Sequence, residues 1–270
     1  MNRTTSPQPG DTLRWLDTVD STNDALALWS KDGAPDGATL AADAQTAGRG
    51  RLGHRWVSPP GLNLAASILL ETDAPPDRLC TLPLLAGLAV ARTIARLAPD
   101  IAPDIAIKWP NDVWCHDRKL CGILCEVAPK PPGAPPRIIA GIGVNMNSRH
   151  EDFPEALRPS VTSLSIETGR EWDRRDFLLR LRDELLAMRD AWEVRGLSPF
   201  LAELQARDAL EGRALAIESG SRTEHGVAAG IAESGELLLR QPGGTLLPIV
   251  AGDVHIVRQP DASPSGLPRD

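Results

Sequence analysis

Three arginines alternate with three glycines in one short segment, which reads Gly-Arg-Gly-Arg-Leu-Gly-His-Arg over residues 48–55 and is followed by Trp56. Glycines let backbone N–H groups come close to a phosphate or carboxylate, and guanidinium groups form charge-assisted, often bidentate, hydrogen bonds to the same oxygens. The segment therefore predicts a loop that binds an anion. A solvent-exposed basic turn has the same composition and stays open as an alternative.

A predicted strand over residues 137–147 has two faces of different composition. One face is apolar throughout, and the other carries glycines and amides: Ile139, Gly141, Gly143, Asn145 and Asn147. Glycines expose the backbone, while amides both donate and accept hydrogen bonds. This face indicates a ligand contact, or else a close crossing of another element at the glycines.

A third segment, residues 108–122, concentrates polar groups around a turn. Only four of the 29 cationic residues are lysines, and two of them, Lys108 and Lys119, lie here together with Asn111 and Asp112. The pattern predicts a strand end, a tight turn and a returning strand, and such turns often hold the fixed polar groups of a binding site.

The elements that must position these residues follow from periodicity and turn signals. Residues 13–210 are predicted to mix strands with helices, including an almost entirely apolar helix over 81–97 that should be buried against a sheet. Ser21 or Thr22 is expected to cap a helix over 23–31, and Asp173 is expected to cap a helix that follows it. The other predicted elements are strands over 38–43, 62–70, 104–109, 119–127 and 137–147, and a helix over 199–209.

Beyond Gly212 the pattern becomes all-β, with five short strands separated by glycine-containing turns. This predicts a small barrel-like module over residues 211–258, and a domain boundary near residue 210. The two ends, residues 1–12 and 259–270, are rich in Pro, Ser and Asp and are predicted to be disordered tails.

Composition and charge exclude several classes of protein. A formal charge of −7 argues against nucleic acid as the main partner. Neither an apolar run near 18 residues nor an apolar leader is visible, so a cytoplasmic protein without a membrane span is expected.

On one strand Cys121 and Cys125 would stand about 13 Å apart, too far for a disulfide, and reduced thiols in the core are expected rather than a metal framework.

Taken together, the segments resemble those of the biotin protein ligases and occur in that family's order, over about residues 14–258. The residues that carry the resemblance are Asp20 to Asp24, Gln45 to Gly53 with Trp56, Lys108 to Asp112, Arg118 to Leu124, and Gly141 to Asn145.

The resemblance implies a fold, an activity and substrates. The fold is α+β: a mixed β-sheet catalytic domain packed with helices, class II synthetase-like, over residues 13–210, followed by a small SH3-like β-barrel. The activity is an ATP-dependent ligation, in which biotin and MgATP give biotinyl-5′-AMP and the biotinyl group then passes to one lysine of a biotin carboxyl carrier domain. Biotin, ATP and Mg2+ are implied, with no metal held by protein side chains.

The resemblance also assigns roles to residues. Lys119, Arg51 and Asp112 are the implied catalytic residues, although Asp112 could equally be a residue that stabilises the turn. The implied biotin-binding residues are Ser21, Thr22, Asn23, Gln45, Gly48, Arg49, Gly50, Arg51, Lys119, Gly122, Gly141 and Gly143. The implied ATP and adenylate residues are Arg49, Arg51, Trp56, Asn111, Lys119 and Asn145.

Some features depart from the family or leave alternatives open. Leu52 and His54 stand where more cationic character is expected, which could weaken the local field. Family members that repress transcription carry an N-terminal helix-turn-helix, which about 12 residues cannot form, so no repressor activity is expected. A lipoate or octanoyl ligase and a non-catalytic biotin-binding module remain as alternatives. The sequence also leaves open whether the protein is a monomer or a homodimer.

Overall fold

The computed structural model describes residues 12–219 and 222–257. The two predicted disordered tails therefore lie outside the described residues, except for residue 12.

A mixed sheet forms the centre of the molecule, as predicted, and it has seven strands. Its strand order is β1-β2-β3-β7-β6-β5-β4, with β1 and β2 parallel and every other neighbouring pair antiparallel. The predicted hairpin of the two strands before residue 147 is β6 and β7. The strands are β1 (Leu13–Val19), β2 (Thr39–Gln45), β3 (Leu64–Glu71), β4 (Ile105–Lys108), β5 (Asp112–Cys115), β6 (Arg118–Val127) and β7 (Arg137–Val144).

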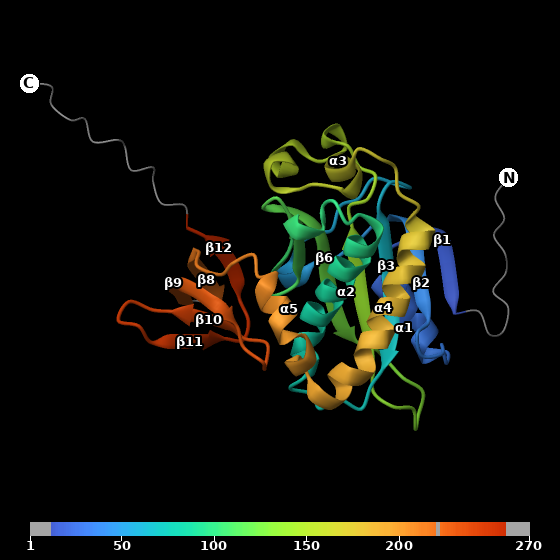
Figure 1. The fold of residues 1–270 in the computed structure, drawn as a ribbon. Coiled ribbons are helices and arrows are strands. Elements are labelled where there is room, and N and C mark those ends of the chain that lie inside the picture. The colour runs from blue at the N-terminus through green and yellow to red at the C-terminus, as the bar shows by residue number, and fades with distance from the viewer. Residues whose placement is uncertain (1–11, 220–221, 258–270) are drawn as a thin grey trace, which may run out of the picture.

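Helices cover both faces of this sheet (Figure 1). On one face lie α2 (Leu82–Leu97) and α4 (Arg174–Arg195), and on the other lies α1 (Thr22–Lys31). Two shorter helices are α3 (Leu164–Thr168) and α5 (Leu201–Ala206). Asp173 caps α4 as predicted, since its carboxylate accepts hydrogen bonds from the two backbone N–H groups of Arg175 and Asp176.

The apolar helix α2 is packed in the core, as its sequence predicts. Residues 79–97, which contain it, form the one helical stretch within the described ranges that is long and apolar enough to cross a membrane. Eleven residues of α2 are buried, and they pack against the sheet and α4. The apolar character of this helix therefore serves the interior of the fold.

The two faces of β7 separate the core from the open side of the sheet. Ile138, Ala140 and Ile142 belong to the core that contains α2, whereas Ile139 packs in a smaller cluster beneath α1. Because side chains alternate along a strand, Gly141 and Gly143 follow Ile139 on the α1 face. Both glycines line a cavity on this face of the sheet, which is described below.

A second sheet, called here the C-terminal sheet, contains the five strands predicted after Gly212. They are β8 (Ala214–Ser219), β9 (Arg222–Ile231), β10 (Leu237–Arg240), β11 (Leu246–Ile249) and β12 (Asp253–Ile256), in the antiparallel order β11-β10-β9-β8-β12. Within the described residues no pairing joins β11 to β12. The sheet lies beside α5 (Figure 1), and the indole N–H of Trp109 donates to its Gly235 carbonyl at 2.9 Å.

Two strands of the large sheet were not predicted individually, β1 and β5. The sequence pattern predicts a single turn between residues 109 and 119, but the chain forms the short strand β5 there and makes two hairpins. The second turn uses His116 and Asp117 at φ of 50° and 59°, a left-handed conformation that usually indicates glycine or asparagine. Without a glycine, the turn signal is missing from the sequence.

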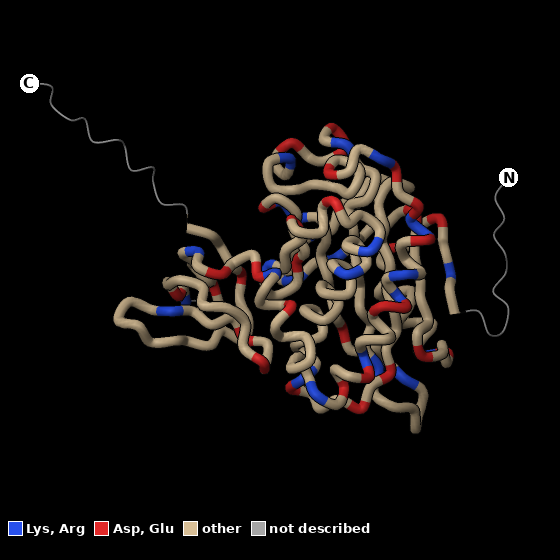
Figure 2. Tube along the Cα trace, in the orientation of Figure 1, with Lys and Arg blue, Asp and Glu red and all other residues tan. Residues whose placement is uncertain are grey.

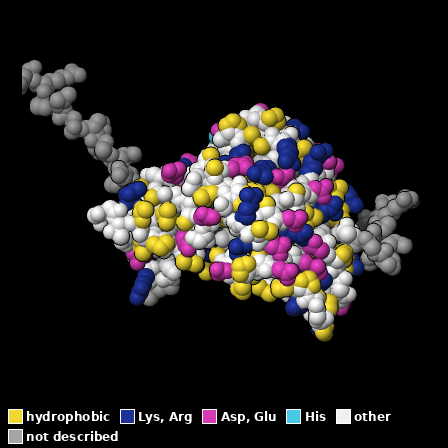
Figure 3. Space-filling view, turned by 60° about the horizontal axis from the view of Figure 1, so that its bottom comes forward, with side chains coloured by type: hydrophobic (Ala, Val, Ile, Leu, Met, Phe, Trp, Pro, Cys, Tyr) yellow, Lys and Arg dark blue, Asp and Glu magenta, His cyan; other side chains and the backbone are white. Residues whose placement is uncertain are grey.

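Charged residues of both signs alternate over the molecule. Figure 2 shows acidic and basic positions interspersed along the whole described trace, and the face in Figure 3 mixes both signs with apolar side chains. An anion would therefore have to be bound by a local group of cations rather than by an extended basic surface.

Candidate active site

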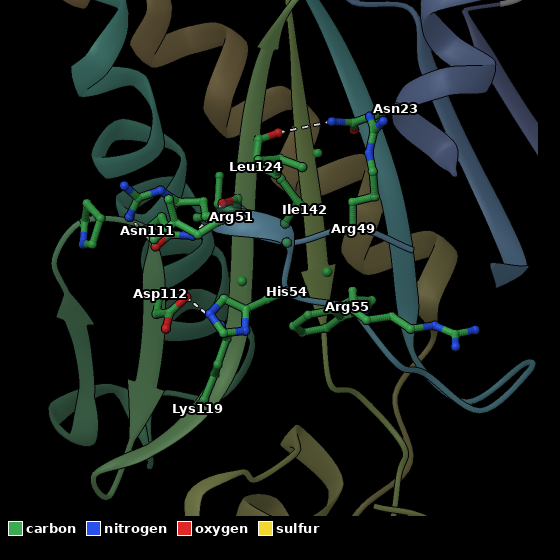
Figure 4. A pocket seen from close by; sticks show the side chains of 18 of the residues that line it. Asn23, Arg49, Arg51, His54, Arg55, Asn111, Asp112, Lys119, Leu124 and Ile142 are labelled. Carbon is green, nitrogen blue, oxygen red and sulfur yellow. Dashed lines mark hydrogen bonds and ion pairs between the residues drawn. The ribbon is translucent and has the colours of Figure 1, made fainter. Parts of the chain in front are cut away.

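A cavity lies on the α1 face of the seven-stranded sheet (Figure 4). Its walls come from the start of α1, the end of β2, the loop that follows β2, the turn between β4 and β5, and parts of β3, β6 and β7. Residues Gly252, Asp253 and Val254 of the C-terminal sheet complete the lining. The three segments singled out from the sequence thus meet at one place.

One part of the cavity, called here the polar end, is built from neutral side chains that already hydrogen bond to each other. The Gln45 side-chain oxygen accepts from the Thr22 backbone N–H at 2.8 Å and from its hydroxyl at 3.1 Å. Ser67 Oγ lies 2.8 Å from Thr22 Oγ1 and 2.6 Å from Asn23 Oδ1. Because its oxygen is used in this way, Gln45 presents its amide N–H groups as donors.

Ser21 occupies the N-cap position of α1 without capping it. Its backbone is extended, and its side chain makes no hydrogen bond to the first turn of the helix. The sequence predicts Ser21 or Thr22 as a cap, but in the structure the Ser21 hydroxyl lines the cavity, and Thr22 bonds to Gln45. Both hydroxyls therefore belong to the site rather than to helix capping.

The Gly-Arg loop, residues 46–56, folds back on itself above the cavity. Trp56 N–H donates to the Gly48 carbonyl at 2.9 Å and Gly50 N–H to the His54 carbonyl at 2.7 Å. Leu52, at its tip, has a φ of 51° and is exposed. Two of the loop's three arginines point in different directions: Arg51 lies beside Asn111, and Arg49 beside Asn23 (Figure 4).

The other part of the cavity, called here the charged end, contains Arg51, Lys108, Lys119 and Asp112. Lys119 Nζ lies 2.7 Å from Asp112 Oδ1 and 5.8 Å from the centre of the Trp56 ring. Arg51 donates to Asn111 Oδ1 at 3.4 Å, and Asn111 is held in turn by the Ile123 carbonyl at 2.7 Å. Three cations thus converge on one carboxylate.

Burial lowers the pKa of two cations at the charged end, Lys108 and Arg51. Desolvation lowers the pKa of Lys108, which the carboxylates of Asp112 and Asp253 partly oppose. Desolvation also lowers the pKa of Arg51, again against the same two carboxylates. The charged forms are therefore stabilised less than in water, and an incoming anion would offset that cost.

The glycines of β6 and β7 make room for side chains of the site. A Cβ on Gly143 would lie 2.5 Å from the Trp56 ring, and one on Gly141 would lie 2.2 Å from Asn23 Oδ1. On Gly122 a Cβ would stand 3.0 Å from Trp56 and 3.2 Å from Lys119 Nζ. Close crossing, one of the two interpretations left open by the sequence, accounts for these glycines, and the residues that cross there line the cavity.

Most of the residues expected in the site lie together in the structure, and two do not line the cavity. Gly48 packs under Trp56 and Gln45 at the base of the loop. Asn145 is buried just beyond β7, and its side-chain amide donates to the Thr162 carbonyl at 3.0 Å. Asn145 therefore helps to hold the chain after β7, and its contact with adenine stays a prediction. The other expected residues do line the cavity. They are Ser21, Thr22, Asn23, Gln45, Arg49, Gly50, Arg51, Trp56, Asn111, Asp112, Lys119, Gly122, Gly141 and Gly143.

Four further charged or titratable residues line the cavity without having been assigned to it from the sequence: Lys108, His54, Arg55 and Asp253. Lys108 carried a signal, since it is one of four lysines and precedes the turn of the third segment. His54 belongs to the Gly-Arg loop and lies 3.8 Å from Asp253. Asp253 had no local signal, because it reaches the cavity only through the placement of the C-terminal sheet.

The four cysteines are free thiols, and none lines the cavity. Burial raises the pKa of the Cys115 and Cys125 thiols to about 12. Cys115, His116 and Glu167 come within 4.8 Å of one another, but Glu167 is held by His116 at 2.9 Å and by Arg118 at 2.8 Å. This cluster is an ion-pair network at the end of β5.

Comparison with known families divides the chain into two matched regions. Residues 15–145 match the Biotin/lipoate A/B protein ligase family, a description that covers both of the ligase alternatives. Residues 210–257 match the Biotin protein ligase C terminal domain. The biotin--[acetyl-CoA-carboxylase] ligase of Paracoccus denitrificans is 35% identical to 85% of this chain, over 94% of its own length.

The chain belongs to the biotin protein ligase family. The biotin--[acetyl-CoA-carboxylase] ligase of Mycobacterium tuberculosis (strain ATCC 25618 / H37Rv) is likewise 35% identical, with 92% of this chain and 91% of that protein covered. The structure of the Aquifex aeolicus biotin protein ligase in complex with biotin and ATP superimposes with a TM-score of 0.77 at 30% identity, covering 92% of this chain and 99% of that one. These matches favour a biotin ligase over a lipoate or octanoyl ligase.

Proposed function

We propose that this protein is an ATP-dependent ligase that converts biotin to biotinyl-5′-AMP and transfers the biotinyl group to a lysine of a biotin carboxyl carrier domain. The observation that carries the proposal is the division of one cavity into a neutral polar end and a charged end, with Lys119 in the latter. Biotin has the same division, since it has a neutral ureido ring at one end and a carboxylate at the other.

The polar end suits the ureido ring. That ring has two N–H donors and one carbonyl acceptor, and it requires both kinds of partner in a confined site. Gln45 offers amide donors, and the hydroxyls of Ser21 and Thr22 can donate or accept. The network through Ser67 and Asn23 holds these groups in place before a ligand arrives.

The charged end suits the adenylation step. A carboxylate oxygen of biotin attacks the α-phosphorus of ATP, the new O–P bond forms, and the bond to the β-phosphate oxygen breaks with release of pyrophosphate. Two anions must approach each other, so nearby cations lower the barrier by stabilising the charge of the transition state. Lys119 is the proposed central cation, with Arg51 and Lys108 on either side and Trp56 and Asn111 beside the adenylate.

Mg2+ is expected to arrive with the phosphates of ATP and to neutralise the departing pyrophosphate. The residues present fit such an ion, because the carboxylates of Asp112 and Asp253 line the cavity and Mg2+ prefers oxygen ligands.

The transfer step requires an uncharged lysine amine on the carrier. The amine attacks the acyl carbon, a C–N bond forms, and AMP departs with the electrons of the C–O bond. Asp112 is the proposed group that accepts the proton or orients the amine, and its Oδ1 lies 2.7 Å from Lys119 Nζ. The lining from Gly252 to Val254 indicates that the C-terminal sheet helps to enclose the intermediate.

We also propose the domain division at residues 13–210 and 211–258, which the two matched family regions support. The free thiols of the core favour a reducing compartment such as the cytoplasm.

Pyrophosphate exchange tests this function. Labelled pyrophosphate should enter ATP only when biotin is added, and neither lipoate nor octanoate should replace it. Addition of a purified carrier domain should then give one biotinylated lysine, detected by mass spectrometry. Exchange with lipoate alone would make the protein a lipoate ligase, and binding of biotin with no exchange would make it a non-catalytic binding module.

A further inference from the structure

The first arginine of the Gly-Arg loop is held outside the charged end by two carboxylates. The Arg49 guanidinium lies 2.9 Å from Asp24 Oδ1 and 2.8 Å from Glu126 Oε2. Asp24 belongs to α1 and Glu126 to β6, so the loop is tied to a helix and to a strand of the catalytic domain. Arg51, two residues later, turns inward to Asn111 instead.

Glu126 also connects this contact to the polar end. Its Oε2 accepts from the Asn23 side-chain amide at 2.6 Å, and Asn23 Oδ1 lies 2.6 Å from Ser67 Oγ. Ser67 in turn contacts Thr22, whose partner is Gln45. The loop is therefore linked to the side chains that face the ureido ring in the proposed function.

We infer that Arg49, Asp24 and Glu126 form a clasp that holds the Gly-Arg loop over the cavity and so sets how long biotinyl-5′-AMP remains bound. The inference rests on the proposed function for its intermediate, but the clasp itself is a property of the loop. It makes Arg49 a positioning residue rather than a ligand of the adenylate.

The conformation of the loop tip makes such a clasp useful. Leu52 has a left-handed backbone and an exposed side chain, so it contributes little packing to hold the loop. Exposed ion pairs are individually weak, but a loop that opens and closes at small free-energy cost responds to weak contacts. Loss of the clasp should therefore alter the loop and leave the stability of the core nearly unchanged.

The loop can be tested without any ligand. Trypsin cleavage at the Arg51–Leu52 bond is followed by mass spectrometry in wild type, Arg49→Gln, Glu126→Gln and the double variant. Glu126→Gln keeps an acceptor for Asn23 while removing the charge that faces Arg49. We expect cleavage about three to ten times faster in each single variant, with the double variant no faster than the singles. Arg49→Lys should recover part of the protection.

The matched control is the exposed ion pair of Asp176 and Arg180 on α4, whose atoms lie 2.9 Å apart. Asp176→Asn should leave both loop cleavage and ligand retention at wild-type values. Arg49→Gln and Glu126→Gln should also release preformed biotinyl-5′-AMP about three to ten times faster, while the melting temperature changes little.

Four outcomes decide between the interpretations. Cleavage at the wild-type rate in the clasp variants, or fully additive effects in the double variant, would overturn the inference. So would loss of adenylation in Arg49→Gln with unchanged cleavage, because Arg49 would then be a direct ligand. Faster, non-additive cleavage in a protein that makes no biotinyl-5′-AMP would uphold the clasp and refute the proposed function instead.

Discussion

The two ends of the cavity differ in whether their side chains have enough partners within the protein. At the polar end, Thr22, Gln45, Asn23 and Ser67 hydrogen bond to one another within 3.1 Å. At the charged end, three cations face Asp112 and Asp253, and burial lowers the pKa of two of them. One end is complete within the protein, whereas the other has more positive than negative charge.

This difference separates recognition from chemistry. A preformed neutral network orients a neutral ring at little cost in reorganisation. A partly buried excess of positive charge is unfavourable alone, and it becomes favourable when phosphates and a carboxylate bring negative charge. Substitutions at the charged end should therefore affect the rate of adenylation, and substitutions at the polar end should affect the affinity for biotin.

The largest effect is expected at Lys119. Lys119→Ala should fold normally but slow single-turnover formation of biotinyl-5′-AMP by about a hundredfold or more, because it removes the central charge of the transition state. Lys130→Ala, which changes an exposed lysine outside the cavity, is the control and should behave as wild type. An unchanged rate in Lys119→Ala would remove this residue from the reaction.

A smaller effect is expected at the polar end. Gln45→Leu should weaken biotin binding by about five- to a hundredfold, since the ureido ring and Thr22 would both lose a partner. The rate at saturating biotin should fall much less. Isothermal titration with biotin measures the change, with Gln241→Leu in the C-terminal sheet as control. A normal affinity accompanied by a large loss of rate would reverse the roles assigned to the two ends.

Arg51 should govern retention more than synthesis. Arg51→Gly should still make some biotinyl-5′-AMP but release it about ten times faster, because the loop loses its inward contact with the bound anion. The escaped mixed anhydride acylates neutral amines, so a streptavidin blot should show labelling of a lysine-rich bystander protein. If adenylate is made and the bystander stays unlabelled, the retention role is wrong.

The smallest effect concerns stability. Burial lowers the pKa of Lys108, so between its folded and unfolded pKa values the unfolded chain binds more protons and stability rises with pH. Lys108→Met should therefore melt about 1–2 °C higher than wild type at pH 7, and the difference should shrink as pH rises toward the unfolded value near 10.4. Thermal unfolding at several pH values measures it. A gap that widens with pH would contradict the assigned direction.

Much of the fold could be predicted because its signals are local. Asp173 as a cap, the apolar residues of α2 and the glycine-separated strands after Gly212 need only neighbouring residues to be interpreted. The strand β5 was missed because it has four residues and its turn places His116 and Asp117 in a conformation that their types do not indicate.

The residues of the candidate site also differ in whether a local sequence signal indicates them. Lys119 and Arg51 stood out because lysine is rare in this chain and because glycines surround the arginine. The resemblance implies that Asn145 binds adenine, which stays a prediction, and its hydrogen bond to the Thr162 carbonyl beyond the end of β7 had no local signal. Asp253 and the partners of Arg49 depend on contacts between distant segments, which no local pattern contains.

A crystal structure of the protein with biotinyl-5′-AMP would test the two-ended cavity most directly. The ureido ring should lie within hydrogen-bond distance of Gln45 and Thr22, and the phosphate within reach of Lys119 and Arg51. Arg49 should stay paired with Asp24 and Glu126. A ligand bound in the reverse direction, with the ureido ring against Lys119 and the phosphate beside Gln45, would contradict the account.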